Sequence, residues 1–296
     1  MRKISIIGVG RVGGALALAL SREGYVIENL IVRNPETASK IVGLLAGSPR
    51  VVRLEAITGI SSDIVFIATQ DSEIAGVAES LAGKLKTALP PVLHMSGALS
   101  SEALNRLREK GVPTGSLHPL VSLSDARLGA ARFAGAFFCV EGEPAAVAAA
   151  AKVVAALGGK SFTIATEYKT LYHAAAVTSA GHFVALVDVA VEMLARCGLS
   201  AARAQEILLP LIKSTVENLE AQTPAEALTG TFARADVETF EKHLAALDRE
   251  VSAEAREIYL QLGARSAHLA ERQGANAENL KEILAKISLA KKNFRC

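Results

Sequence analysis

Two histidines stand where they could give a proton to a bound molecule. His118 lies at the end of a short apolar run and precedes Pro119, and a residue before proline is held in an extended backbone. His173 lies in a helical pattern further along the chain. Because histidine titrates near neutral pH, either ring could protonate a C=O or C=N bond as that bond is reduced. A hydrogen-bonded structural histidine is the alternative interpretation at both positions.

The helical pattern around His173 brings a second cation to the same face. Lys169, His173, Ala176 and Ala180 follow i, i+4, i+7, i+11 spacing, which aligns them along one side of a helix. An ammonium there would help to bind a carboxylate. We therefore predict that His118 and His173 face each other across a cleft between two domains. His173 is the preferred general acid, with Lys169 beside it.

A polar loop later in the chain could complete a substrate pocket. Thr229 and Arg234 lie in this loop, and an arginine can clamp a carboxylate through two parallel hydrogen bonds. Asp236, which follows, is interpreted as a helix cap. Two residues nearer the N-terminus also receive structural interpretations, Asp71 as a helix cap and His94 as a core histidine.

A glycine-rich turn near the N-terminus predicts a dinucleotide site. The apolar run 4–7 leads directly into the G-x-G-x-x-G pattern of Gly8, Gly10 and Gly13, and a helical pattern follows. Gly8 permits the tight turn from strand to helix, and Gly10 lets the backbone approach a pyrophosphate. Gly13 lets the helix pack closely on the strand. A glycine-rich turn of some other α/β protein is the alternative.

The phosphates of the dinucleotide select the next candidates. The N–H groups of the helix that opens at Arg11 and Val12 are free to meet a pyrophosphate. A second apolar run ends at Arg33 and Asn34, where an acidic residue would bind the ribose 2′-hydroxyl of NAD. An arginine fits the 2′-phosphate of NADP instead, so NADP(H) is the predicted cofactor. A solvated strand-end residue is the alternative for Arg33.

Two more strand ends carry small or polar residues. Ala68, Thr69 and Gln70 follow one apolar run, and Ser96 and Gly97 follow another. Because the carboxyl ends of the strands face the cofactor in such sheets, we predict that these five residues line the nicotinamide side. For Ser96 and Gly97, a turn into the next helix is an equally good interpretation.

The first 165 residues alternate apolar runs with helical patterns, which indicates βαβ units and a doubly wound, mostly parallel sheet. The predicted strands are 4–7, 29–32, 51–53, 64–68, 92–95, 115–117, 137–140 and 161–164. The predicted helices between them are 12–21, 35–45, 72–81, 101–110 and 144–157.

From residue 166 to 296 the strand patterns vanish, and an all-α domain is predicted. The expected helices are 167–197, 201–221, 237–247, 250–272 and one from about 277 onward. Ser200 and Asp236 are suitable N-caps, and Thr223 and Glu226 have the spacing of a capping box. Substrate should bind where this domain meets the carboxyl ends of the strands.

Composition narrows the possible partners. The chain of 296 residues has a net charge of +2 from 32 basic and 30 acidic residues, which argues against nucleic-acid and membrane-surface binding. Its three cysteines, Cys139, Cys197 and Cys296, have no metal-ligand spacing, and the first two are expected to be buried thiols. The apolar stretch 174–191 carries His182 and Asp188, so we expect a buried helix of a cytoplasmic protein rather than a membrane span.

These motifs together resemble a family of Rossmann-like oxidoreductases. Members carry a C-terminal helical domain of formerly unknown function and are related to pyrroline-5-carboxylate reductase, ketopantoate reductase and 3-hydroxyacid dehydrogenases. The matching segments are 8–13, 94–98, 116–120, 171–176 and 227–230. The resemblance implies a Rossmann domain, a helical domain like that of 6-phosphogluconate dehydrogenase, and a homodimer formed through the helical domain. The chain departs from the family pattern at Ala180, Thr231 and Ala235, which leaves the substrate open.

The sequence therefore predicts an NADP(H)-dependent reductase. Its substrate would be a small molecule that bears a carboxylate, either a 2-oxo acid or a cyclic imine. The cofactor would supply hydride, while the protein would orient the substrate and supply a proton. The alternative is a non-catalytic NADP-binding sensor or partner-binding protein, which needs the glycine-rich turn but no proton donor.

Overall fold

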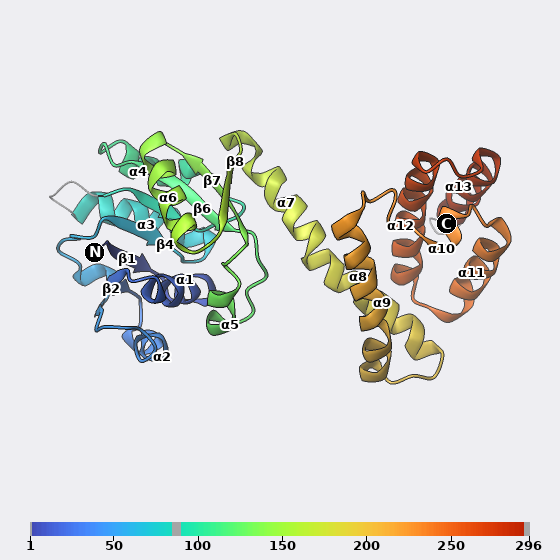
Figure 1. The fold of residues 1–296 in the computed structure, drawn as a ribbon, viewed down its shortest axis with the longest axis horizontal. Helices are drawn as coiled ribbons and strands as arrows, with labels where there is room; N and C mark the ends of the chain where they lie inside the picture. Colours follow the sequence, from blue (N-terminus) through green and yellow to red (C-terminus); the bar gives the residue numbers. More distant parts are fainter. Residues whose placement is uncertain (1, 85–89, 293–296) are drawn as a thin grey trace. The chain divides into compact units, whose positions relative to one another are not determined.

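The computed structural model describes residues 2–84 and 90–292 and divides the chain into two compact units, Met1–Ala180 and Gly181–Cys296. The first unit is α/β and the second is helical, which confirms the predicted fold class (Figure 1). The boundary predicted near residue 165 lies earlier than this division. Helix α7 (Lys169–Ser179), which carries His173, therefore belongs to the first unit.

One eight-stranded sheet organises the first unit, in the order β3-β2-β1-β4-β5-β6-β7-β8. All eight predicted strands are present, with ends that differ by a few residues. They are β1 (Lys3–Ile7), β2 (Val26–Ile31), β3 (Arg50–Val52), β4 (Ile64–Ile67), β5 (Val92–His94), β6 (Thr114–Pro119), β7 (Phe137–Gly142) and β8 (Lys160–Thr163). Neighbouring strands are parallel except for β6 and β7. The carboxyl ends of β1, β2, β4, β5 and β6 therefore meet at one edge.

Helices cover both faces of this sheet. The α-helices are α1 (Arg11–Arg22), α2 (Ser39–Val42), α3 (Asp71–Lys84), α4 (Asn105–Arg108), α5 (Ala126–Ala131) and α6 (Pro144–Ala156). Successive strand residues face opposite cores, because side chains alternate along a strand. Phe66 packs with α1 and α6 on one face, whereas Val65 and Ile67 pack with α3 and α4 on the other. Of these helices, α5 was not predicted.

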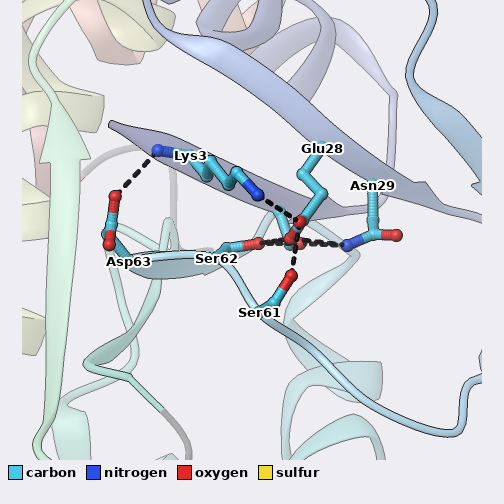
Figure 2. Close-up of polar contacts among 7 residues, drawn as sticks. Lys3, Glu28, Asn29, Ser61, Ser62 and Asp63 are labelled. Atoms are coloured by element: carbon cyan, nitrogen blue, oxygen red, sulfur yellow. Dashed lines mark hydrogen bonds and ion pairs between the residues drawn. The ribbon is translucent and has the colours of Figure 1, made fainter. Parts of the chain in front are cut away.

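A polar network ties β1, β2 and the segment before β4 together at the opposite edge of the sheet (Figure 2). Asn29 donates to Ser5 Oγ at 2.8 Å, and Ser5 and Ser62 share a hydrogen bond of 2.5 Å. Glu28 accepts hydrogen bonds from Ser61 and Ser62. Burial raises the pKa of Glu28, but these serines and a nearby lysine outweigh it, so that the net pKa lies below its usual value.

The second unit is built from helices α8 (Gly181–Arg196), α9 (Ala201–Ala221), α10 (Gly230–Ala233), α11 (Val237–Glu250), α12 (Ala253–Arg272) and α13 (Ala277–Lys292). Two apolar clusters hold α10 to α13 together, and Phe232 packs against both. The predicted caps are confirmed: Ser200 accepts from the N–H of Arg203, and Asp236 accepts from that of Thr239.

Three expectations about this part of the chain were wrong. The helix expected over 167–197 is broken at Ala180, beside Gly181, because glycine has low helix propensity. The expected polar loop after Thr229 contains helix α10. Cys197 is exposed because it follows the last turn of α8, whereas Cys139 is buried as predicted. Cys296 lies outside the described residues.

The apolar stretch 174–191 was expected to form a buried helix, but it is mostly exposed in the structure. Val184 on α8 is 69% exposed, and Leu211 on α9 is 64% exposed. By length and composition, the helical stretch Thr166–Arg196 could cross a membrane, and its most apolar window is not buried in the structure. Among the described residues, none buries this apolar face of α8. The hydrophobic sequence alone therefore did not identify what buries it.

Candidate cofactor and active site

The glycine-rich turn between β1 and α1 has the close contacts that the sequence predicts. Gly8 has φ +91°, and a Cβ there would lie 2.8 Å from the carbonyl oxygen of Ala68. A Cβ on Gly13 would lie 2.0 Å from the carbonyl oxygen of Gly8, so only glycine lets the helix approach the strand. A Cβ on Gly10 meets nothing within 4 Å. The backbone at Gly10 therefore faces open space that a pyrophosphate could occupy.

A cavity of about 700 Å³ adjoins this turn. Gly8, Gly10, Arg33 and Asn34 line it, as the sequence predicts for the phosphate and adenosine side of a dinucleotide. Gln70, expected on the nicotinamide side, also lines this cavity and not the cleft at the two histidines. The side chain of Arg33 is 80% exposed, so a bound anion can reach its guanidinium.

Two contacts in this cavity were not predicted from sequence. Arg33 Nη1 lies 2.8 Å from Oε1 of Glu73 on α3, so a carboxylate already holds the cation. Asn34 accepts a hydrogen bond from the N–H of Glu36 and caps a 3-10 turn. The amide side chain of Asn34 is thus partly occupied by its own backbone, whereas the Arg33 ion pair is exposed and exchangeable.

A second cleft, of about 340 Å³, continues from the first cavity, because Ala68 and Thr69 line both. Its walls come from the start of α1, the ends of β4, β5 and β6, and α7. The remaining predicted residues in its lining are Arg11, Val12, Ser96, Gly97, His118 and His173. A dinucleotide that extends from the first cavity past Thr69 would place its nicotinamide here.

The two histidines meet at Gly97. The ring centroids of His118 and His173 are 5.9 Å apart, with the ring planes at 77°. A Cβ on Gly97 would lie 2.4 Å from Cδ2 of His173 and 2.8 Å from Nε2 of His118. The predicted proximity of the two rings is therefore found. Both residues belong to the first unit, because α7 does, and not to two different domains.

Burial shapes the chemistry of His118. It lowers the pKa of His118 to about 3, and the positive charges of Lys169 and His173 act in the same direction. A histidine with such a pKa is neutral at pH 7. His118 is therefore unsuited to act as an imidazolium acid, which leaves His173 as the candidate donor.

Lys169 does not present its ammonium to the cleft, contrary to the prediction. Its side chain is 1% exposed, and Nζ donates to Ser116 Oγ at 2.7 Å. Ser116 in turn donates to Glu141, which also accepts from Ser101 and Thr166. Burial lowers the pKa of Lys169 and raises that of Glu141, but hydrogen bonds bring the Glu141 pKa below its usual value. The helical face was predicted correctly, but a buried carboxylate on β7 attracts its lysine.

The turn after β5 is held by its own side chains. Ser96 Oγ accepts from the N–H groups of Ala98 and Leu99 and donates to Asp71 at 2.8 Å. His94 accepts from the N–H of Ser96 and contacts the carbonyl of Ser100, and burial lowers its pKa to about 4. His94 is therefore the core histidine expected. The Ser96 hydroxyl shapes the turn, while the residue still lines the cleft.

Two functional candidates were missed from sequence. Tyr172 donates or accepts a hydrogen bond of 2.7 Å with His118 Nδ1, and Asp71 lines the cleft besides opening α3. The position of Tyr172 beside His173 and three residues after Lys169 was the available signal, but nothing in the spacing paired it with His118. Thr229 and Arg234 flank α10 in the second unit and are exposed, so the cleft described above is formed without them.

Two family models match the chain, and the second match extends across the division between the two units. Residues 1–119 match the family model of a Rossmann-like domain, and residues 136–266 match the one described as Domain of unknown function (DUF2520). The chain carries a Rossmann-like domain and a DUF2520 domain. The predicted resemblance is thereby confirmed. The DUF2520 match includes α7 and therefore His173. No curated protein matches the sequence.

Solved structures share the same fold across nearly the whole chain. A protein from Thermotoga maritima has a TM-score of 0.72 at 21% identity, covering 91% of this chain and 99% of its own. The 1-pyrroline-5-carboxylate reductase of Streptococcus pyogenes has a TM-score of 0.58 at 18% identity, covering 98% of each chain. The reductive aminase of Aspergillus terreus, in complex with NADPH and ethyl levulinate, has a TM-score of 0.58 at 16% identity, covering 100% and 94%.

Proposed function

We propose that this protein is an NADP(H)-dependent oxidoreductase that reduces a C=O or C=N bond of a small, carboxylate-bearing substrate. The observation that carries the proposal is the continuous path from the glycine-rich turn and Arg33 to the cleft where His118 and His173 meet. The named reductases with the same fold, one in complex with NADPH, support this class of reaction.

The residues present fit a bound NADP(H). The backbone at Gly10 would lie against the pyrophosphate, and Arg33 would pair with the 2′-phosphate. Ala68 and Thr69 would line the nicotinamide ribose, since they border both cavities. When bound, the reduced cofactor supplies a hydride to the electrophilic carbon of the substrate.

His173 is the proposed proton donor for the oxygen or nitrogen of the reduced bond. Its ring lines the cleft and packs against the ring of His118, so it can reach a molecule held there. The buried ammonium of Lys169 does not contact the substrate in this scheme. Thr229 and Arg234 stay candidates for binding the substrate carboxylate.

We further propose a homodimer formed through the helical domain. The exposed apolar side chains on α8 and α9 include Phe183, Val184, Leu186, Leu211 and Val216. Several exposed apolar side chains on two neighbouring helices favour a protein interface. The adjoining α7 belongs to the first unit, where Lys169 joins a buried hydrogen-bond network, and this supports a folded domain rather than a bilayer as the surroundings of α7. A cytoplasmic location is proposed accordingly.

Titration of the cofactor tests the proposal first. NADPH should bind with ten- to hundredfold higher affinity than NADH when each is titrated by fluorescence, because the guanidinium–phosphate pair contributes about 1–3 kcal/mol. Replacing Arg33 by serine should remove this preference. Arg106→Ser is the matched control, because Arg106 pairs with Glu109 on an exposed helix outside the cavity. Equal affinity for the two cofactors would contradict the role of Arg33.

Turnover then separates an enzyme from a sensor. NADPH oxidation should be detected with at least one member of a panel of 2-oxo acids and cyclic imines. NADPH binding without oxidation across the panel, together with a protein partner captured only when NADP is present, would instead favour a non-catalytic sensor.

A further inference from the structure

A hydrogen bond joins Tyr172 to His118 at the cleft, and this bond has no role in the proposed reaction as described above. Tyr172 Oη and His118 Nδ1 are 2.7 Å apart, and the two rings meet edge to face at 5.7 Å. The tyrosine ring is itself held, by an edge contact with Phe162 at 5.8 Å and by the Lys169 ammonium 5.6 Å from its centroid. Tyr172 is thus fixed from three sides.

We propose that Tyr172 is a positioning residue that holds His118 in the tautomer with its proton on Nε2. His118 then presents a constant N–H donor to the oxygen or nitrogen of the substrate bond that is reduced. The inference rests on the proposed function for the role of that donor, although the tautomer itself is a property of the protein alone.

Hydrogen-bond accounting selects this tautomer. Tyr172 is half-buried, and among the described residues its hydroxyl has no hydrogen-bond partner besides His118. If Nδ1 carried the proton, it would donate to Tyr172, and no protein group among the described residues would accept the phenolic hydrogen. If Tyr172 donates to Nδ1, the hydroxyl is satisfied. Burial raises the pKa of Tyr172, so the phenol keeps the proton that this bond requires.

The other ring nitrogen faces the cleft. Nε2 of His118 is the atom that a Cβ on Gly97 would approach to 2.8 Å, and both residues line the cavity. The charged and titratable groups that act on His118 are Lys169, His173 and His94, and each of them disfavours a positive charge on its ring. The ring therefore stays neutral and keeps its Nε2 proton.

This assignment gives the two histidines different tasks. With hydride supplied to the substrate carbon by bound NADPH, a new C–H bond would form and the electron pair of the C=O or C=N bond would move to the heteroatom. His173 gives that atom its proton. His118 keeps its own proton and stabilises the developing negative charge by a hydrogen bond, as a preorganised donor does in an oxyanion hole.

Nitrogen NMR of the histidine rings tests the inference without any substrate. In the cofactor-free protein between pH 5 and 8, His118 should show a protonated Nε2 and an unprotonated, hydrogen-bonded Nδ1. In Tyr172→Phe, the Nδ1 resonance should move to the position of a lone pair with no donor. A wild-type proton on Nδ1, or an unchanged Nδ1 signal in the variant, would overturn the proposal.

The second unit offers a matched control. Tyr259 Oη lies 2.7 Å from His243 Nδ1, with the rings at 6.0 Å and 84°. Tyr259→Phe therefore removes the same kind of bond and should change the resonances of His243 while leaving those of His118 in place. His94 of the first unit shows whether Tyr172→Phe is folded, because its hydrogen bonds to Ser96 and Ser100, and hence its signals, should be unchanged.

Kinetics adds the functional arm. With a turned-over substrate, Tyr172→Phe should lower kcat by roughly ten- to a hundredfold with a nearly unchanged Kd for NADPH, because a donor is misdirected but not removed. An unchanged kcat would overturn the positioning role. If no substrate is found, the proposed function fails while the NMR result still decides the tautomer.

Discussion

Gly97 is the position at which the geometry of the cleft can be tested most directly. Alanine at this position adds one methyl group, which would lie 2.4 Å from His173 Cδ2 and 2.8 Å from His118 Nε2. Ordinary van der Waals contact begins at 3.4 Å, so the His173 ring must retreat by about 1 Å. Overpacking of this kind costs about 1–3 kcal/mol of stability.

The effect on catalysis should exceed the effect on folding. A displacement of about 1 Å in a reacting group lowers turnover by roughly 10²-fold, so Gly97→Ala should lose most NADPH oxidation. Fluorescence titration should show NADPH affinity close to wild type, because the contacts at Gly10 and Arg33 are untouched. Gly83→Ala is the control, since a Cβ on Gly83 meets nothing within 4 Å. It should keep full activity.

One result would refute this reasoning. If Gly97→Ala is folded, as judged by its thermal unfolding, and oxidises NADPH at the wild-type rate, then the two rings do not hold the reacting atoms. A loss of turnover that follows entirely from weaker NADPH binding would likewise place Gly97 with the cofactor and not with the proton donor.

Three further perturbations follow from the site. Glu73→Gln should raise NADPH affinity severalfold without changing NADH affinity in fluorescence titrations, because it frees Arg33 from its 2.8 Å ion pair; equal gains for both cofactors would contradict this. His173→Asn should reduce turnover by roughly 10²–10⁴ while NADPH affinity is kept, and a fully active variant would remove His173 from the mechanism. Acid should destabilise the fold. The pKa values of His118 and His94 are about 3 and about 4 in the folded chain, whereas the ordinary value in the unfolded chain is 6.5. The unfolded state therefore binds more protons than the folded state below pH 6.5. The free energy of unfolding should therefore fall between pH 6.5 and pH 4, by up to about 1.4 kcal/mol per pH unit for each histidine in urea titrations, and His118→Gln should make the decline shallower.

The sequence predicted the parts of this site that local patterns control. Short apolar runs predicted the strands. Because the carboxyl ends of parallel strands lie at the same edge of a sheet, the segments that carry Thr69, Gly97 and His118 were expected to meet there. The glycine-rich turn was predictable because its conformation depends on the glycines themselves. Helical spacing placed His173 on the correct face of α7.

Side-chain contacts between segments far apart in the chain could not be predicted from the sequence. Lys169 was expected to bind the substrate, but it donates to Ser116, which donates to Glu141, and no spacing rule connects the strands of these two residues to α7. Tyr172 was overlooked for the same reason, since its partner is on β6. The exposure of the apolar face on α8 also could not be predicted. Hydrophobicity indicates which side chains favour burial, but it does not identify the surface that buries them.

The polar network at the opposite edge of the sheet has a consequence for cofactor recognition. Asn29, Ser5 and Ser62 bond to one another only when β1, β2 and β4 are paired as observed, with Ser5 beside Asn29. Sliding β2 by one residue would shift it by about 3.3 Å and break the buried hydrogen bond from the Asn29 amide to Ser5. The same strands end at Gly8 and Arg33. Buried serine and asparagine side chains at one end of the sheet therefore hold the glycine-rich turn and Arg33 at a set distance at the other, so residues remote from the proposed cofactor site shape it.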